Sequence, residues 1–156
     1  MAAAITLKKV LEKAIEKEVG SQLIYLGLSQ RVSQPATRDV LLELAQQEKG
    51  HQRLLEQYLR GKLKGGALSS RRNVDYRIAE WLDQPPISPD MELKDAFLLA
   101  ANREKASHEL YLGLAHLHPG GRVKELFEEL AAQELEHKRR VEFLYTEVAF
   151  PQTDGG

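Results

Sequence analysis

The tetrapeptide Glu-x-x-His occurs twice in this sequence, at Glu48–His51 and at Glu134–His137. Each copy has a further glutamate 30 residues upstream, Glu18 for the first copy and Glu104 for the second. One Glu-x-x-His in a glutamate-rich chain is a weak indication of function, but two copies with the same upstream spacing are a strong one. Together they supply four carboxylates and two imidazoles in two symmetric halves. This is the ligand set of a dinuclear metal site inside a helix bundle.

The rest of the sequence predicts the helices that such a site needs. Only six prolines interrupt the chain, and the stretches between them are rich in Leu, Ala, Glu, Lys, Gln and Arg, which favour helices. Apolar residues recur there at steps of three and four. We expect four helices, at about 4–33, 36–62, 91–117 and 121–149. Thr6 is suited to begin the first helix, and Ser88 to Asp90 to begin the third.

Two of the predicted connections are short and one is long. The turns at Ser33–Ala36 and His118–Gly121 contain Pro or Gly, so the helices on either side of each should form an antiparallel hairpin. The crossover at 63–90 is long enough to run the full length of the bundle. We expect it to contain a short helix at about 74–82, with Trp81 packed on the bundle. The prediction is one domain over residues 1–150, with hairpins at 4–62 and 91–149 and a flexible tail at 151–156.

The two hairpins repeat each other with an offset of 86 residues. Identical pairs include Ala14/Ala100, Glu18/Glu104, Ser21/Ser107, Tyr25/Tyr111, Gln47/Gln133, Glu48/Glu134 and His51/His137. In each hairpin the two glutamates are equidistant from the turn, about 20 Å away at a rise of about 1.5 Å per residue. Each also falls at a position where the helical pattern asks for an apolar residue, and the histidine shares that face. Four carboxylates and two imidazoles should therefore meet at the middle of the bundle.

The energetics of burial favour a metal at this meeting point. A buried, unpaired carboxylate costs several kcal/mol, and four facing one another repel strongly. Two divalent cations would cancel the four charges while the imidazoles complete the coordination. The mixed oxygen and nitrogen donors suit iron or manganese, and the absence of cysteine excludes thiolate zinc sites and iron–sulfur clusters. The alternative is an ordinary bundle with four solvated glutamates.

The composition argues against several other functions. The formal net charge of −1 gives no general attraction to nucleic acid or to an anionic membrane. The positive charges near the N-terminus follow a short apolar stretch, which is the wrong order for a secretory signal. The longest apolar run, Ala96–Ala101, is far shorter than the roughly 20 residues that span a bilayer. We expect a soluble, cytoplasmic protein that binds neither nucleic acid nor membrane.

These residues resemble the rubrerythrin/erythrin branch of the ferritin-like superfamily over about 8–148. The most specific parts are Glu-x6-Tyr and Glu-x-x-His, each present once in each half. The resemblance implies an all-α, ferritin-like four-helix bundle made of two repeated αα-hairpins joined by a long crossover. It also implies a non-haem di-iron centre, with manganese or a mixed pair of metals as alternatives.

The resemblance also assigns roles to individual residues. Glu48 and Glu134 would bridge the two metals. Glu18 and Glu104 would be terminal ligands, and His51 and His137 would each bind one metal. Tyr25 and Tyr111 would donate hydrogen bonds that orient ligand carboxylates for catalysis. The alternative for both tyrosines is core packing, with the hydroxyl satisfied elsewhere.

The sequence departs from rubrerythrins at two points. Ser107 stands where they carry an extra carboxylate ligand. His108 could reach the site, but its repeat mate is Gln22, so we expect a polar supporting or surface role. Classical rubrerythrins also have a cysteine-ligated rubredoxin domain, and this chain has no cysteine. Electrons would then come from an external donor, such as a rubredoxin-like protein, a reductase or a small reductant.

The resemblance implies an oxidoreductase that reduces hydrogen peroxide or dioxygen, working as a homodimer. Two alternatives stay open from the sequence. One is a ferroxidase or iron-binding protein, and the other is a di-iron hydroxylase of an organic substrate, which would need a substrate channel.

Overall fold

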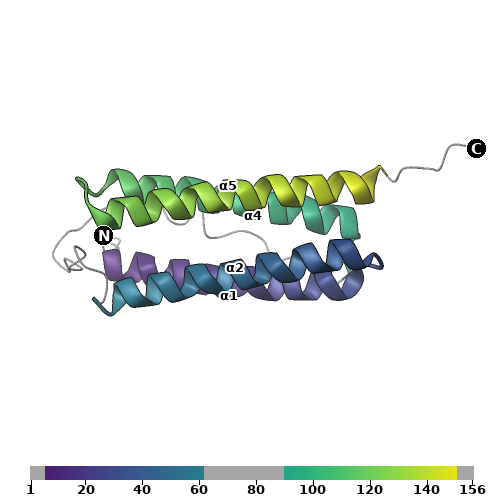
Figure 1. The fold of residues 1–156 in the computed structure, drawn as a ribbon, viewed down its shortest axis with the longest axis horizontal. Helices are drawn as coiled ribbons and strands as arrows, with labels where there is room; N and C mark the ends of the chain where they lie inside the picture. Colours follow the sequence, from purple (N-terminus) through teal and green to yellow (C-terminus); the bar gives the residue numbers. More distant parts are fainter. Residues whose placement is uncertain (1–5, 62–89, 151–156) are drawn as a thin grey trace, which may run out of the picture.

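The computed structural model describes residues 6–61 and 90–150, and helices make up most of both segments. The four helices are α1 (Leu7–Arg31), α2 (Pro35–Leu59), α4 (Leu93–His116) and α5 (Arg122–Ala149). They form a bundle in which α1 and α2 make one layer and α4 and α5 the other (Figure 1). Neither described segment contains a β-strand. The predicted all-α four-helix bundle is confirmed.

The ends of the helices follow from local sequence. Thr6 caps α1 as predicted, because its side-chain oxygen accepts a hydrogen bond from the backbone N–H of Lys9 at 3.2 Å. Pro35 takes the first position of α2, where a missing N–H costs no helical hydrogen bond. The predicted start of the third helix was two residues early. This helix begins at Leu93, and its N-cap Glu92 makes no side-chain capping bond.

The turn between α4 and α5 depends on glycine. Gly120 and Gly121 have φ angles of 146° and 90°, values that residues with a Cβ rarely adopt. Gly121 is also the N-cap of α5, so the chain reverses and starts the next helix at once.

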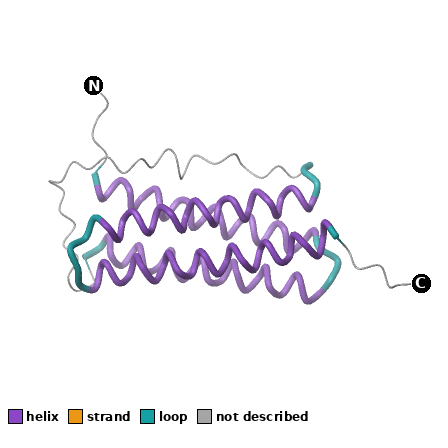
Figure 2. Tube along the Cα trace, turned by 90° about the horizontal axis from the view of Figure 1, so that it is seen from above, coloured by secondary structure: helices purple, strands orange, loops and turns teal. Residues whose placement is uncertain are grey.

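The order and direction of the helices match a bundle with one long connection. α2 ends and α4 begins at opposite ends of the bundle, and each helix is antiparallel to its neighbour in the other layer (Figures 1 and 2). Helices pack closely within each hairpin and more loosely between hairpins, where α1 meets α4 and α2 meets α5. The predicted short helix at 74–82, Trp81 and the tail at 151–156 lie outside the described residues.

Within residues 6–61 and 90–150, the buried apolar side chains form two clusters, one toward each end of the bundle. The first cluster lies at the end of the bundle that contains the α4–α5 turn. It includes Leu11, Leu55, Tyr111, Leu114 and Phe127. The second lies nearer the α1–α2 turn and includes Tyr25, Leu44, Phe97, Ala100 and Val141. The layer between them holds the buried glutamates and histidines, so apolar side chains enclose this layer from both ends.

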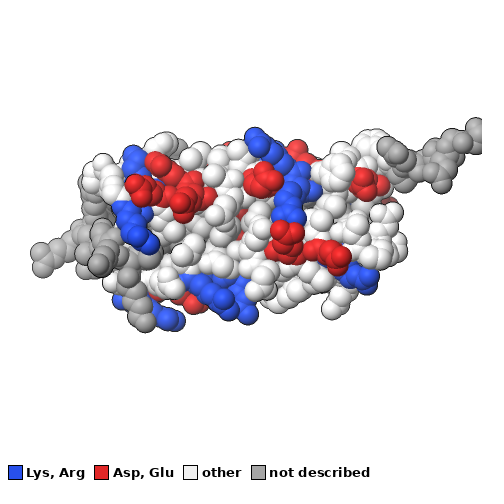
Figure 3. All heavy atoms as spheres, in the orientation of Figure 1, with Lys and Arg blue, Asp and Glu red and all other residues white. Residues whose placement is uncertain are grey.

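On the face seen in Figure 3, acidic and basic side chains are interspersed among uncharged ones, in keeping with the near-zero net charge. Within residues 6–61 and 90–150, no helix combines the length and hydropathy required of a bilayer-spanning segment.

Candidate metal centre

All six side chains predicted as ligands are buried in the middle layer of the bundle. Their exposed fractions are at most 2%, and they come one or two from each helix: Glu18, Glu48, His51, Glu104, Glu134 and His137. The alternative of four solvated glutamates is therefore wrong. The carboxylates lie at one level because each is about equally far from the turn of its own hairpin.

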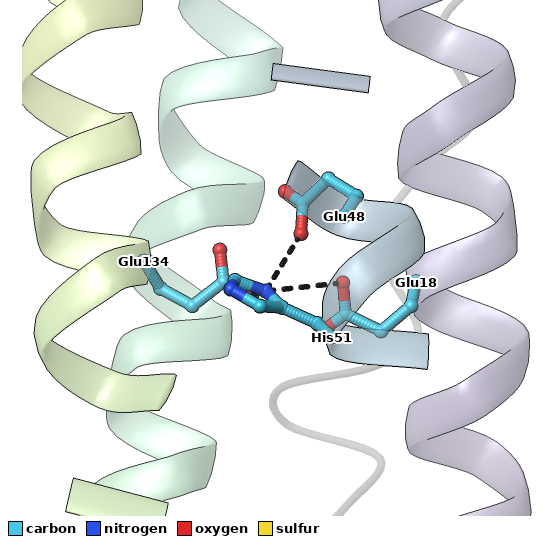
Figure 4. Close-up of side chains that lie close together, drawn as sticks. All are labelled: Glu18, Glu48, His51 and Glu134. Atoms are coloured by element: carbon cyan, nitrogen blue, oxygen red, sulfur yellow. Dashed lines mark hydrogen bonds and ion pairs between the residues drawn. The ribbon is translucent and has the colours of Figure 1, made fainter. Parts of the chain in front are cut away.

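The six residues form two overlapping groups. In each group the potential ligand atoms all lie within 4.8 Å of one another. The first group contains Glu18 and His51, the second contains Glu104 and His137, and the pair Glu48 and Glu134 belongs to both. Figure 4 shows the first group, with three carboxylates directed at the His51 ring. We call the two groups the His51 position and the His137 position.

The shared carboxylates each turn one oxygen toward each imidazole. His51 Nδ1 is 3.1 Å from Glu48 Oε2 and 3.4 Å from Glu134 Oε1. His137 Nδ1 is 3.2 Å from Glu48 Oε1 and 3.4 Å from Glu134 Oε2. The two rings are nearly parallel, with centroids 5.4 Å apart. This is the arrangement that two bridging carboxylates between two metal positions require.

The remaining two carboxylates each face one imidazole. Glu18 Oε2 is 3.7 Å from His51 Nδ1, and Glu104 Oε2 is 3.7 Å from His137 Nδ1. These two oxygens and Glu134 Oε2 are buried, and none of them has a hydrogen-bond partner among the described residues. Leaving a buried acceptor unsatisfied costs about 1–3 kcal/mol. A cation at the His51 position would satisfy Glu18 Oε2, and a second one at the His137 position would satisfy the other two oxygens, so the donor set fits a pair of metal ions.

Both tyrosines reach a carboxylate of the other hairpin. Tyr25 on α1 donates a hydrogen bond to Glu104 Oε1, and Tyr111 on α4 donates one to Glu18 Oε1. Core packing alone is therefore ruled out as their role. Burial raises the pKa of each phenol and the neighbouring carboxylate raises it further, so both remain protonated donors. Each bond leaves the other oxygen of the carboxylate directed at the site.

Two glutamines that sequence reasoning did not place at the site support the histidines. His51 Nε2 donates to Gln133 Oε1 and His137 Nε2 donates to Gln47 Oε1, both at 2.5 Å. The tautomer follows from the acceptor, because an amide oxygen requires the proton on Nε2 and leaves Nδ1 to face the carboxylates. The available signal was the identity of Gln47 and Gln133 in the repeat, each directly before a shared glutamate.

A lysine also enters the site, and the sequence analysis missed it. Lys17 Nζ lies 3.4 Å from Glu134 Oε1 and 3.8 Å from Glu18 Oε1, and only 7% of its side chain is exposed. Burial lowers the pKa of Lys17, but the carboxylates of Glu134 and Glu18 raise it by more, so the ammonium stays charged. Its repeat mate is Arg103. Among the described residues, Arg103 forms no ion pair with a carboxylate, and its Nε has no hydrogen-bond partner.

The four carboxyl groups fall into two electrostatic classes. Burial raises the pKa of Glu18 and Glu104, and the negative shared carboxylates raise it further. Burial also acts to raise the pKa of Glu48 and Glu134, but cationic and hydrogen-bonding neighbours lower it by more. For Glu48 these neighbours are both imidazoles, and for Glu134 Lys17 comes first. These shifts favour the ionised form of the shared pair, and they favour a proton or another cation on the terminal pair.

Burial acts on the pKa of the imidazoles in the opposite sense, but their net pKa is raised as well. Burial lowers the pKa of His51 and His137, but hydrogen bonds to the surrounding carboxylates raise it by more.

Ser107 and His108, which the comparison with rubrerythrins singled out in the sequence, bond to backbone oxygens and not to the ligand candidates. Ser107 Oγ donates to the backbone oxygen of Arg103 at 3.0 Å. His108 Nδ1 donates to the backbone oxygen of Ala131 at 2.6 Å, a supporting role as expected.

Comparison with known proteins agrees with this geometry. The family model described as Rubrerythrin matches residues 9–84. Over residues 9–84 the chain is thus similar to rubrerythrins. This segment contains Glu18, Glu48 and His51. The second hairpin supplies the equivalent residues of the repeat. The resemblance inferred from the motifs is confirmed.

The fold is also found in a solved structure, that of a hypothetical protein from Pyrococcus furiosus. The two chains superpose with a TM-score of 0.74 at 22% identity, covering 95% of this chain and 93% of the other. At this identity the likeness shows a common fold. No sequence among curated proteins matches the chain.

Proposed function

We propose that this chain is a non-haem di-iron oxidoreductase that reduces hydrogen peroxide, or dioxygen, with electrons from an external donor. The observation that carries the proposal is the sharing of Glu48 and Glu134 between two groups of ligand atoms. The rubrerythrin match supports iron as the metal. Manganese or a mixed pair would use the same oxygen and nitrogen donors.

The residues of the site would have different roles in binding the metals. Glu48 and Glu134 would be held in common by two metal ions, Glu18 and His51 would complete one position, and the second hairpin's equivalents would complete the other. Two ferrous ions held there would supply two electrons together to an O–O bond. The apolar clusters on both sides keep bulk water away, and the tyrosine hydroxyls hold the terminal carboxylates in orientation.

The space around the site favours a small oxidant over an organic substrate. A cavity of about 330 Å³ lies between α2 and α5, beside Val40 and Phe143, and none of the six ligand candidates lines it. Beside Glu104 and Tyr25, the space between the described side chains is too narrow to hold even a water-sized molecule. A peroxide needs far less room than an apolar substrate.

The source of electrons and the assembly belong to the same proposal. The chain has no cysteine, so it holds no thiolate-ligated iron centre of its own. A rubredoxin-like protein, a reductase or a small reductant would supply the electrons. As in the family, two copies would form a homodimer, which sedimentation at several protein concentrations tests directly.

The test is anaerobic loading with ferrous iron, followed by oxidation. We expect about two iron ions per chain, since the donor set makes two positions. The absorbance of the oxidised site should develop faster with hydrogen peroxide than with air, saturating at about one peroxide per pair of metals, because one peroxide takes two electrons. Elemental analysis of protein from its native host identifies the metal. Glu134→Ala, which removes a shared ligand, is the control.

Three results would redirect the assignment. Iron uptake far beyond two ions per chain would identify a storage or ferroxidase function. Acceleration of dioxygen consumption by an apolar compound would identify a hydroxylase. Wild-type metal stoichiometry in Glu134→Ala would refute the shared position of that carboxylate.

A further inference from the structure

The two metal positions are not electrostatically equivalent, although their ligands are. Every ligand in one group has an identical residue at the equivalent place in the other. The asymmetry comes from a residue outside the ligand set. Lys17 contacts the His51 position, whereas its repeat mate Arg103 makes no ion pair with a carboxylate of the His137 position among the described residues.

The contact made by Lys17 is specific to one oxygen of a shared carboxylate. Glu134 turns Oε1 toward His51 and Oε2 toward His137. Lys17 Nζ lies 3.4 Å from Oε1, and its second contact is Glu18 Oε1 at 3.8 Å. Both partners of the lysine are thus ligands of the His51 position, and the oxygen it binds on Glu134 is the one directed there.

We propose that Lys17 is a built-in cation that weakens metal binding at the His51 position, so that the two positions fill in order, His137 first. This inference rests on the proposed di-metal function. A divalent ion at the His51 position must share Glu134 Oε1 with the ammonium or displace it. It must also sit beside a like charge in a site from which water is excluded, where charges interact strongly. A metal at the His137 position meets neither obstacle.

The ordering has a chemical consequence for the protein. The lysine offsets part of the negative charge of the four carboxylates before the pair of metals is complete. A chain with one ion would hold it at the His137 position, with the ammonium serving as the second cation. The complete pair would form only when metal is abundant enough to occupy the weaker position.

Manganese(II) titration of the metal-free protein tests this inference. We expect two binding steps whose dissociation constants differ by about tenfold or more, the size that a single fixed charge a few Å away can produce. Lys17→Met removes the charge and keeps the length of the side chain, so the weaker step should strengthen and the ratio should shrink. Lys13→Met is the matched control. Lys13 lies one turn earlier on α1 with a half-exposed side chain, and its variant should titrate as wild type.

A pair of ligand variants gives a readout that does not require the lysine variant to fold. His51→Ala and His137→Ala remove equivalent ligands from the two positions. With one equivalent of manganese, His137→Ala should bind about tenfold more weakly than His51→Ala. Combined with Lys17→Met, the two should bind nearly alike.

The outcomes separate this inference from the function it rests on. If the wild-type chain binds no manganese, cobalt or iron pair, the proposed function fails. If it binds two ions with equal affinity, if Lys17→Met leaves the ratio of the steps unchanged, or if His51→Ala is the weaker of the two histidine variants, only the role of Lys17 is overturned.

Discussion

The two classes of carboxyl group predict opposite effects for substitutions that look alike in the sequence. Glu48 is completely buried and accepts hydrogen bonds from both imidazoles, at 3.1 and 3.2 Å. In Glu48→Gln the metal-free protein keeps two buried imidazoles without this shared anion. Glu18→Gln should behave differently. The raised pKa of Glu18 favours its protonated, neutral form, and a glutamine oxygen can still accept the hydrogen bond from Tyr111.

The size of the difference in stability between the two variants follows from the burial of Glu48 together with its two imidazole partners. Removing one partner of a buried ion pair costs about 3–5 kcal/mol. The histidines can recover part of this by losing their protons, so we expect Glu48→Gln to cost about 2–4 kcal/mol. In a chain of this size that lowers Tm by about 5–15 °C. Glu18→Gln, which replaces one neutral group by another of similar shape, should cost less than about 1 kcal/mol.

Thermal unfolding followed by far-ultraviolet circular dichroism, after removal of metal by a chelator, measures both effects. The loss in Glu48→Gln should be larger at about pH 6 than at about pH 8. A raised imidazole pKa contributes stability that is fully present below 6.5 and declines as pH rises toward the folded-state value. Equal losses in the two variants, or a larger loss in Glu18→Gln, would refute the division of the carboxyl groups.

Three further predictions concern the residues around the ligands. Tyr111→Phe leaves Glu18 Oε1 without its donor and should destabilise the metal-free protein by about 1–3 kcal/mol; chemical unfolding at wild-type stability would argue against this hydrogen bond. Gln133→Leu removes the acceptor that orients His51, so metal affinity should fall about 10–100-fold, and a titration curve unchanged from wild type would count against this role. In the folded protein the pKa values of the terminal carboxyls lie above 4.5 and those of both imidazoles lie above 6.5. Metal binding should therefore release protons, and metal affinity should weaken as pH falls. The stability of the metal-free protein should decline as pH rises above these values. Calorimetry in buffers of different ionisation enthalpy counts the protons, and a count of zero would contradict these shifts.

The sequence was sufficient to predict the bundle and the meeting of the six ligand candidates. Helical periodicity defined the buried face of each helix, and the equal spacing from each turn put Glu18 and Glu48 at one height. The geometry of a regular helix is sufficient for both predictions. The structure agrees with them to within a few residues at the helix ends.

What the sequence could not predict depends on long side chains and on contacts between hairpins. Lys17 follows the surface side of the helical pattern, but its flexible stem brings the ammonium back to Glu134. The repeat showed a cation at this place in both halves, yet not which one turns inward. Likewise, spacing put Tyr25 two turns from Glu18, whereas it bonds Glu104 of the other hairpin, a choice that only the packing of the two hairpins decides.

The hydrogen bonds that orient the ligand candidates, from Tyr25 to Glu104, from Tyr111 to Glu18, from His51 to Gln133 and from His137 to Gln47, all run from one hairpin to the other. A lone hairpin therefore holds half of the ligands and none of the partners that orient them, and it would gain both by pairing with an identical copy. In this protein the two hairpins are parts of one chain, so they need not have identical sequences. Each half is then free to acquire changes that the other does not share, and the unequal placement of a lysine and an arginine at matching sites is one such divergence.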